Sequence, residues 1–99
     1  MNKEEAIALL SAALAPYKDK DYAELSALSG EQSPLRVKGP SGREYDVSIL
    51  IYNGDELLII EGEIFPRPRR MFFQTSLQME FGIAPDNTKY ATSDGQKRE

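Results

Sequence analysis

The sequence predicts one α+β domain, in which two N-terminal helices pack on a three- to four-stranded antiparallel meander sheet. Apolar residues recur at helical spacing in the first third, and from residue 35 onward they alternate with polar ones. Two glycine-containing turns separate the alternating segments. A chain of 99 residues has room for one core. We place the domain at residues 1–90 and expect residues 91–99 to form a flexible tail.

The two predicted helices have clear start signals. Asn2 can cap the first, whose apolar stripe is Ile7, Leu10 and Leu14, and Pro16 is expected to end it. The second is expected to begin at Asp21, where Asp-x-x-Glu with Glu24 forms a capping-box variant, and to end at Gly30. Each helix is apolar on one side only, so both should lie on a sheet.

The first hairpin is predicted in detail because its turn residues fix its register. Gly39-Pro40-Ser41-Gly42 fits a three-residue loop with a bulge, with glycine at the left-handed position. That loop sets apolar against apolar and opposite charges against each other, in the pairs Leu35–Val47, Arg36–Asp46, Val37–Tyr45 and Lys38–Glu44.

The second predicted hairpin follows a strand over residues 45–52 and turns at Asn53-Gly54. A two-residue turn there pairs Ile49 with Leu58 and Val47 with Ile60. The other face of these strands then carries apolar residues, which we expect to be covered by a partner, a second copy or the tail. These residues are Leu50, Leu57 and Ile59.

The last predicted strand follows a basic loop, Pro66-Arg67-Pro68-Arg69-Arg70. Alternation from Met71 to Ile83 indicates a strand, and a short helix over residues 75–81 is the competing interpretation.

Composition excludes several kinds of site. The chain has no cysteine and no histidine, which rules out disulfides, zinc ribbons, histidine metal sites and Ser–His or Cys–His catalysis. No apolar run approaches the length that spans a bilayer, and the acidic start differs from a signal peptide, so we expect a cytoplasmic protein with no membrane partner. The net charge of −4 makes general nucleic-acid affinity unlikely, although residues 66–99 carry six basic and four acidic side chains.

Three carboxylates, Asp46, Glu61 and Glu63, are expected on one face of the sheet. They could bind a hard cation or act as an acid/base pair. We favour a cross-strand ion-pair ladder, because the expected register places Arg36 beside Asp46 and Asp46 beside Glu61, with Lys38, Glu44 and Glu63 in the next row. On this interpretation the protein holds no metal and no cofactor.

The basic loop is the most suggestive run of residues. Arg67, Arg69 and Arg70, with Phe72, could bind an acidic protein surface, or could grip the phosphates of single-stranded nucleic acid while a base stacks on the ring. The loop could also be an ordinary hairpin whose arginines keep a sheet edge soluble. The glycines of Gly39–Gly42 lack the spacing and the lysine of a phosphate-binding loop.

Two stretches resemble small uncharacterised bacterial α+β proteins. They are Tyr22-Ala23-Glu24-Leu25 at the end of a two-helix start, and Val37 to Tyr45 entering a strand. The similar region covers roughly residues 5–65, and the resemblance implies a fold but no activity.

These observations together favour a non-enzymatic protein-binding domain of the accessory, adaptor or inhibitor kind. The basic loop residues and the apolar sheet face of Leu50, Leu57 and Ile59 would be its contact surface, and a homodimer is one form of partner. A single-stranded nucleic-acid binder is the alternative, and a carboxylate metal enzyme is a remote one.

Overall fold

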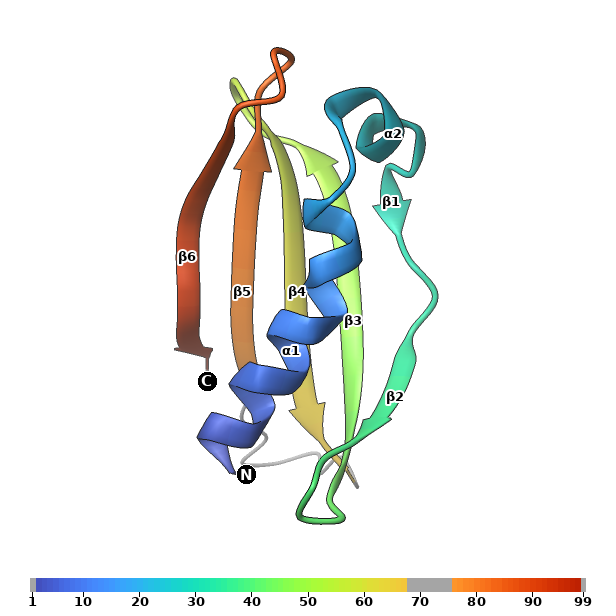
Figure 1. The fold of residues 1–99 in the computed structure, drawn as a ribbon, viewed down its shortest axis with the longest axis vertical. Coiled ribbons are helices and arrows are strands. Elements are labelled where there is room, and N and C mark those ends of the chain that lie inside the picture. The colour runs from blue at the N-terminus through green and yellow to red at the C-terminus, as the bar shows by residue number, and fades with distance from the viewer. Residues whose placement is uncertain (1, 68–75, 99) are drawn as a thin grey trace.

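A computed structural model describes residues 2–67 and 76–98 of the chain, with side chains for 2–67 and 76–91. The fold is α+β, as predicted, with one long helix, one helix of six residues, and a six-stranded antiparallel sheet (Figure 1). The elements, in chain order, are α1 (Lys3–Lys18), α2 (Tyr22–Ala27), β1 (Gly30–Glu31), β2 (Leu35–Lys38), β3 (Glu44–Asn53), β4 (Leu58–Pro66), β5 (Ser76–Ile83) and β6 (Lys89–Arg98). The expected three to four strands were therefore too few.

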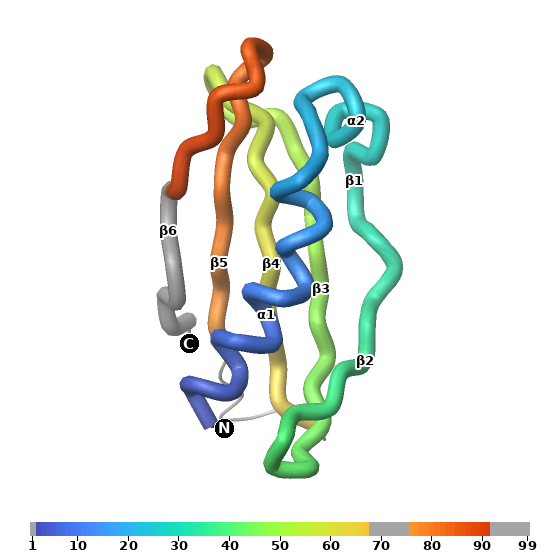
Figure 2. Tube along the Cα trace, viewed as in Figure 1, coloured from blue at the N-terminus to red at the C-terminus, as the bar shows by residue number. Residues whose placement is uncertain are grey.

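The strand order is β1-β3-β4-β5-β6, and β2 also pairs with β3. Strands β1 and β2 lie along the same side of β3 and form one interrupted edge, which the trace in Figure 2 shows running beside β3. Each strand pairs with a sequence neighbour, apart from β1, which reaches past β2 to β3. The predicted meander is confirmed and extends further than expected.

Helix α1 lies across one face of the sheet, which we call the inner face (Figure 1). Its buried residues Ala6, Leu10 and Leu14 join the inward side chains of β3, β4 and β5 in one core. Gly62 in β4 allows the close approach, since a Cβ there would lie 3.0 Å from Leu10 Cδ1 and 3.2 Å from Leu14 Cδ2. The missing side chain on the sheet therefore sets how near the helix can lie.

The prediction for α1 is confirmed at the N-terminus of the helix and wrong at its C-terminus. Asn2 caps the helix as expected, with its Oδ1 accepting a hydrogen bond from the Glu5 N–H at 3.1 Å. Pro16 does not end the helix, which continues to Lys18. Pro16 removes the one N–H that would bond the Ala12 carbonyl, and the helix tolerates this loss for the two residues that follow. Half-buried Tyr17 packs on the core and holds the final residues in place.

Helix α2 has the predicted capping box, in which Asp21 Oδ1 accepts from the Glu24 N–H and Glu24 Oε1 accepts from the Asp21 N–H. A tertiary hydrogen bond also holds the start of the helix: the Tyr22 N–H donates to Asn87 Oδ1 at 2.8 Å, and the two residues are 65 positions apart in the sequence. Gly30 was expected to end it. The helix stops at Ala27 instead, and Gly30, with a φ of 114°, opens β1.

The first hairpin has the predicted register in all four pairs, from Leu35–Val47 to Lys38–Glu44. Gly42 has the positive φ that its position in the loop requires, at 90°, and its N–H donates to the Gly39 carbonyl at 2.9 Å. The inward row of β3 is also as expected, with Tyr45, Val47, Ile49 and Ile51 buried.

The second hairpin differs from the prediction by four residues. Ile49 pairs with Gly62 and Val47 with Ile64, and a four-residue loop over 54–57 closes with the Gly54 N–H donating to the Leu57 carbonyl at 2.8 Å. A shift by an even number keeps the same side chains inside, so alternation could not detect it. The expected register would have placed Glu56 opposite Ile51 on the buried face, which is costly for a carboxylate.

The C-terminal third contains one confirmed strand and one missed strand. Residues 76–83 form β5, so the strand prediction is confirmed there and the alternative of a helix over 75–81 is wrong for residues 76–81; residues 71–75 lie outside the described part. We expected a tail from Ala91, but the backbone from Lys89 to Arg98 forms β6 antiparallel to β5. In the part of the chain that the structure describes, no helix is long and apolar enough to cross a membrane.

Candidate binding surface

The face of the sheet opposite α1, which we call the outer face, is the candidate site. Within residues 2–67 and 76–98 no helix covers it (Figure 1). Residues paired across antiparallel strands share a face, so the outer face can be read as successive rows across the sheet. The rows near the β3–β4 loop differ sharply in chemistry from those near the β2–β3 loop.

The row nearest the β3–β4 loop, which we call the aromatic row, contains Tyr52, Ile59, Gly82 and Tyr90. Tyr52 is 38% exposed and Tyr90 48% exposed, and Ile59 between them is half-buried. Leu57 leans over Gly82, because a Cβ added there would lie 2.7 Å from Leu57 Cδ1. Of the three predicted outer-face residues, Ile59 lies in this row and Leu57 lies over it, together with two tyrosines that alternation alone did not single out.

The next row, which we call the acidic row, contains Glu31, Leu50, Glu61 and Glu80, and its pairing ends at Ser93. Leu50, Glu61 and Glu80 are half-buried and Glu31 is exposed. The predicted apolar residue Leu50 is thus flanked by carboxylates on both neighbouring strands. Neither the aromatic row nor the acidic row includes a lysine or an arginine at any of its paired positions.

The following row is buried at its β5 end only. It contains Ser48, which is exposed, Glu63, which is half-buried, and Gln78, and both Gln78 and the neighbouring Ser76 are only 5% exposed. The Ser76 hydroxyl donates to Glu63 Oε2 at 2.5 Å. On this row burial therefore increases from β3 toward β5.

The predicted ion-pair ladder is corrected by the register of β3 and β4. Arg36 does lie opposite Asp46, but Asp46 lies opposite Phe65, Glu61 opposite Leu50 and Glu63 opposite Ser48. Asp46 is instead bound by Arg67, whose Nη1 lies 3.2 Å from Oδ1 and 3.1 Å from Oδ2. No group of three or more metal-ligating side chains occurs among the described residues.

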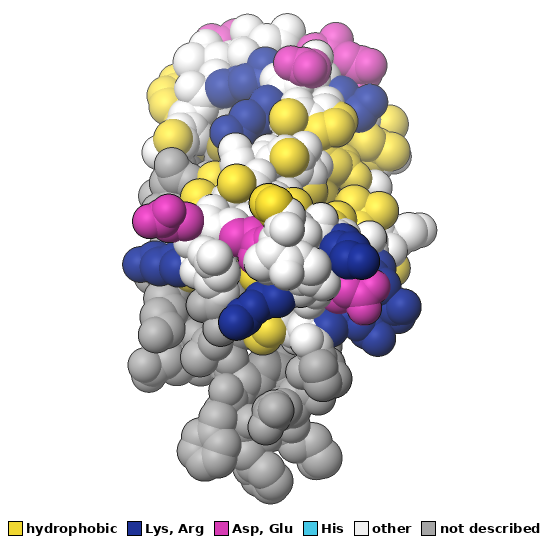
Figure 3. Space-filling model, turned by 60° about the horizontal axis from the view of Figure 1, so that its bottom comes forward, with side chains coloured by type: hydrophobic (Ala, Val, Ile, Leu, Met, Phe, Trp, Pro, Cys, Tyr) yellow, Lys and Arg dark blue, Asp and Glu magenta, His cyan; other side chains and the backbone are white. Residues whose placement is uncertain are grey.

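Basic side chains gather at the opposite end of the sheet, around the β2–β3 loop. They are Arg36, Lys38, Arg43 and Arg67, interspersed with Glu44 and Asp46, and Figure 3 shows both signs side by side at that end. Of the predicted loop residues, the structure describes Arg67, which pairs with Asp46 and whose N–H donates to the Glu44 carbonyl at 3.0 Å. Arg69, Arg70 and Phe72 lie outside the described residues.

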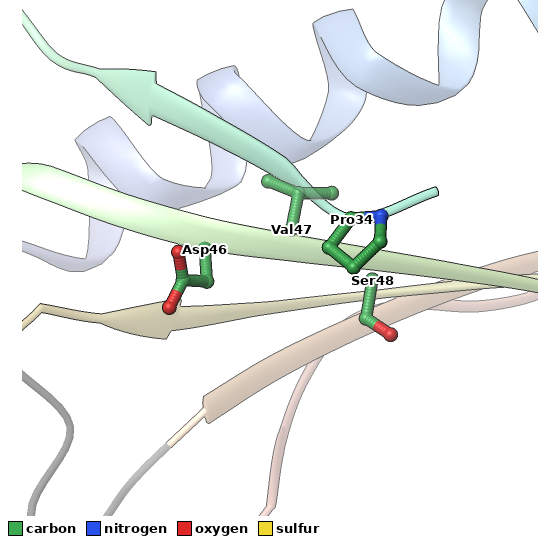
Figure 4. Close-up of a pocket in the computed structure, with 4 residues that line it drawn as sticks. All are labelled: Pro34, Asp46, Val47 and Ser48. Carbon is green, nitrogen blue, oxygen red and sulfur yellow. The ribbon is translucent and has the colours of Figure 1, made fainter. Parts of the chain in front are cut away.

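Shallow hollows lie near the features just described, among the residues that the structure describes. One of about 290 Å³ is lined by Pro34, Asp46, Val47 and Ser48 (Figure 4). It lies between β1 and β2, where three residues of the edge, 32–34, face two residues of β3, 48–49. Val47 points toward the helix layer there, whereas Asp46 and Ser48 point away from it. A second, of about 440 Å³, adjoins the aromatic row and is lined by Asp55, Glu56, Leu57 and Ile59. The third, of about 350 Å³, is lined by Gly42, Arg43, Glu44 and Arg67.

A polar cluster at the first turn of α1 was missed at the sequence level. The Glu5 side chain is tucked against the β2–β3 loop, where Oε1 accepts from the Ser41 N–H at 3.0 Å. Oε2 accepts from the Ser41 hydroxyl at 2.8 Å and from the Tyr45 hydroxyl at 3.0 Å. Gly39 leaves room for this carboxylate, because a Cβ at that position would overlap it. Glu5 and the loop are 36 to 40 residues apart, so no local signal points to the contact.

The cluster shifts both of its titratable groups. The Ser41 N–H, more than any other group, lowers the pKa of Glu5 below its ordinary 4.5, and the two hydroxyls and the charge of Arg43 act in the same direction against burial. Burial, followed by the hydrogen bond to Glu5, raises the pKa of Tyr45 above its ordinary 10.0. Both shifts favour the ionised carboxylate bonded to a neutral phenol, which is a structural arrangement.

Comparisons with known proteins leave the function to be argued from the geometry above. No family model, no curated protein and no solved structure matches this chain.

Proposed function

We propose that this chain is a small non-enzymatic protein-binding domain, of the accessory, adaptor or inhibitor kind, which contacts its partner through the outer face of the sheet. The observation that carries the proposal is the aromatic row, in which two exposed tyrosines flank Ile59 and Leu57 on a face that no described helix covers. Tyrosine is enriched at the centres of protein interfaces, where its ring is buried and its hydroxyl stays hydrogen-bonded.

The chemistry of the titratable groups supports binding rather than catalysis. Near-neutral proton transfer without histidine would need a carboxylate or tyrosine whose pKa is moved toward neutrality. For Glu5 and Asp86 the pKa is lowered, chiefly by the backbone N–H groups of Ser41 and Thr88. Tyr45 is shifted away from neutrality. None of the three lines the hollows beside the outer face.

The basic loop is the second contact element of the proposal. Arg67 is engaged by Asp46, so its removal would disturb the sheet end as well as any contact. A variant that changes only Arg69 and Arg70 to serine separates the two effects. If the loop binds the partner, this variant weakens binding, and urea unfolding of the same variant shows whether the fold is affected.

Nucleic acid has less support as a partner than protein. The accessible rows of the outer face carry Glu31, Glu61 and Glu80, which would repel phosphates, and the described loop arginine already binds a carboxylate.

Position-specific photocrosslinking tests the proposal. A benzoylphenylalanine at Tyr90 lies on the outer face, whereas one at Ala12, an exposed position on α1, lies on the other side of the sheet. We expect discrete crosslinked products from position 90 in the cells that make the protein, and none of the same products from position 12. Equal products from both positions, or none from position 90, would remove the outer face as the contact surface.

A further inference from the structure

We propose that the free edge of β2 binds an extended acidic segment of another protein, which joins the sheet as one more antiparallel strand. Acidic side chains of this segment face Arg36 and Lys38, and apolar side chains alternate with them. The inference goes beyond the proposed function, because it concerns an edge of the sheet and not its outer face. Each surface can bind a partner without the other.

Strand β2 has a backbone that is open on one side. It pairs with β3, and Figure 1 shows it at the margin of the sheet with no described element beyond it. The Gly39 N–H donates to the Arg43 carbonyl at 2.9 Å, which makes these two residues a hydrogen-bonded pair. Such pairs alternate along an antiparallel ladder, so Val37 bonds β3. The N–H and C=O groups of Arg36 and Lys38 therefore point away from β3, toward any strand that is added.

The side chains on the outer side of this edge favour an acidic segment. Arg36 and Lys38 are exposed, and within the described residues neither side chain has a hydrogen bond or an ion pair. Basic side chains outnumber acidic ones at this end of the described sheet, where the set is Arg36, Lys38, Arg43, Arg67, Glu44 and Asp46. In an added strand, the residues opposite Arg36 and Lys38 lie on the same side as these cations, where carboxylates form cross-strand ion pairs.

The inner side of the same strand favours apolar residues. Leu35 and Val37 lie on the face that α1 covers further along the sheet, and Leu35 is 46% exposed while Val37 is half-buried at the rim of the core. Side chains of an added strand opposite these two residues lie beside them. The segment that fits therefore alternates apolar and acidic residues over the four positions of β2.

The charges of β2 also disfavour a second copy of this chain at the edge. Two β2 strands paired antiparallel through their free edges place basic side chains opposite basic ones, which is destabilising. The strand is short and follows Pro34, and both features limit indiscriminate pairing at an open edge. Arg36 and Lys38 thus repel a like strand and attract an acidic one, which is how charge gives specificity to a contact.

The test uses a short fluorescent peptide in which glutamate alternates with valine or threonine, and a matched peptide with glutamine in place of glutamate. Fluorescence anisotropy measures the affinity of each peptide for the full chain. We expect the glutamate peptide to bind, and the glutamine peptide to bind at least about tenfold more weakly. No binding of the glutamate peptide, or equal binding of both, would overturn the inference.

Methylation of the peptide backbone separates strand addition from attraction between charges alone. In the antiparallel pairing the glutamates lie opposite Arg36 and Lys38, so the glutamate N–H groups bond β2 and the N–H groups of the intervening residues point away. N-methylation at the glutamates should weaken binding at least about tenfold, and N-methylation at the intervening residues should change it less than about twofold. Equal losses, or the reverse pattern, would contradict antiparallel addition to this edge.

A pair of matched variants locates the binding. Arg36→Gln with Lys38→Gln removes both charges of the edge, and Lys3→Gln with Lys89→Gln removes two exposed charges elsewhere. We expect about tenfold weaker binding for the first and less than about twofold change for the second. Equal losses would mean general attraction between the peptide and lysine or arginine, and would refute the inference.

Hydrogen exchange in the wild-type protein gives the same answer if the edge variant is unstable. The bound glutamate peptide should slow exchange at the amides of Arg36 and Lys38, which face away from β3, and leave the Val37 amide unchanged. Unchanged exchange at both edge amides in the presence of saturating peptide would rule out strand addition at β2.

Tyr90→Ser distinguishes this inference from the proposed function, because Tyr90 lies on the outer face. We expect it to change peptide binding by less than about twofold. If it weakens the peptide as much as the edge glutamines do, the peptide lies on the outer face, and the inference fails while the proposed function stands. If position 90 gives no crosslinks while the peptide still depends on Arg36 and Lys38, the proposed function fails and the inference stands.

Discussion

Replacing Gly62 by alanine should destabilise the protein, because the new methyl group enters the contact between α1 and β4. It would lie 3.0 Å from Leu10 Cδ1 and 3.2 to 3.3 Å from the two δ carbons of Leu14, so these buried side chains must yield by a few tenths of an ångström. Overpacking of this kind costs about 1–3 kcal/mol. Alanine gains roughly 0.5–1 kcal/mol over glycine inside a strand. The net loss expected is therefore about 1–2 kcal/mol.

Urea unfolding followed by far-UV circular dichroism measures this change, and Gly82→Ala serves as the control. Its methyl group meets Leu57 Cδ1 at 2.7 Å, which is the end of a half-buried side chain on the outer face that can rotate away. The control should lose less than Gly62→Ala. Adding Leu10→Val should restore part of the stability lost by Gly62→Ala, although the same change destabilises the wild type. A Gly62→Ala protein as stable as the wild type, or the absence of coupling to Leu10, would refute this account of how the helix sits on the sheet.

Substitutions at four further positions test the loops, the polar cluster and the start of α2. Gly42→Val should cost about 1 kcal/mol or more in urea unfolding, because a β-branched residue resists the φ of 90°, and Gly42→Asn should cost less. The pKa of Glu5 is lower in the folded state than its ordinary 4.5, so ionised Glu5 stabilises the fold above pH 4.5, and this stabilisation is lost as the pH falls through the pKa of the folded state. Glu5→Gln should therefore make the unfolding free energy depend less on pH in the acid range. The pKa of Tyr45 is raised in the folded state, so the unfolding free energy should fall as the pH rises above 10.0, and Tyr45→Phe should remove this loss. If the pH dependence of the unfolding free energy is the same in Tyr45→Phe as in the wild type, the hydrogen bond from Tyr45 to Glu5 is contradicted. Asn87→Ala should raise the hydrogen-exchange rate of the Tyr22 amide selectively, and an unchanged rate at Tyr22 would show that the Asn87 side chain does not hold the start of α2.

The features that could be predicted from the sequence are those that a few neighbouring residues determine. Asn2 and Asp21 cap their helices through contacts three residues away. The loop from Gly39 to Gly42 sets the register of its own hairpin, since one position requires a left-handed φ. In these cases local hydrogen bonding and steric limits leave a single arrangement.

The features that escaped prediction depend on distant parts of the chain. The loop after Asn53 has four residues, two more than the Asn53-Gly54 turn signal implied. A two-residue turn would bury Glu56 opposite Ile51 of β3, and this cost excludes the shorter hairpin. Strand β6 has a polar sequence with no apolar alternation, so its composition does not predict a strand; its hydrogen-bonded pairing with β5 makes it one. On the candidate surface, Leu50, Leu57 and Ile59 could be foreseen from alternation. The two rows could not, because they require the true register across the sheet.

The order of the strands has a consequence for how the protein is made. Nearly every strand pairs with a sequence neighbour, so the sheet can assemble progressively as the chain leaves the ribosome. Helix α1 precedes all of the strands, yet it packs on β3, β4 and β5. Leu10 and Leu14 pack on Gly62 of β4, so they stay exposed at least until β4 has been synthesised. Helix α1 is therefore synthesised before the strands that bury it, and during that interval the nascent chain displays the apolar side of this helix to the chaperones around it.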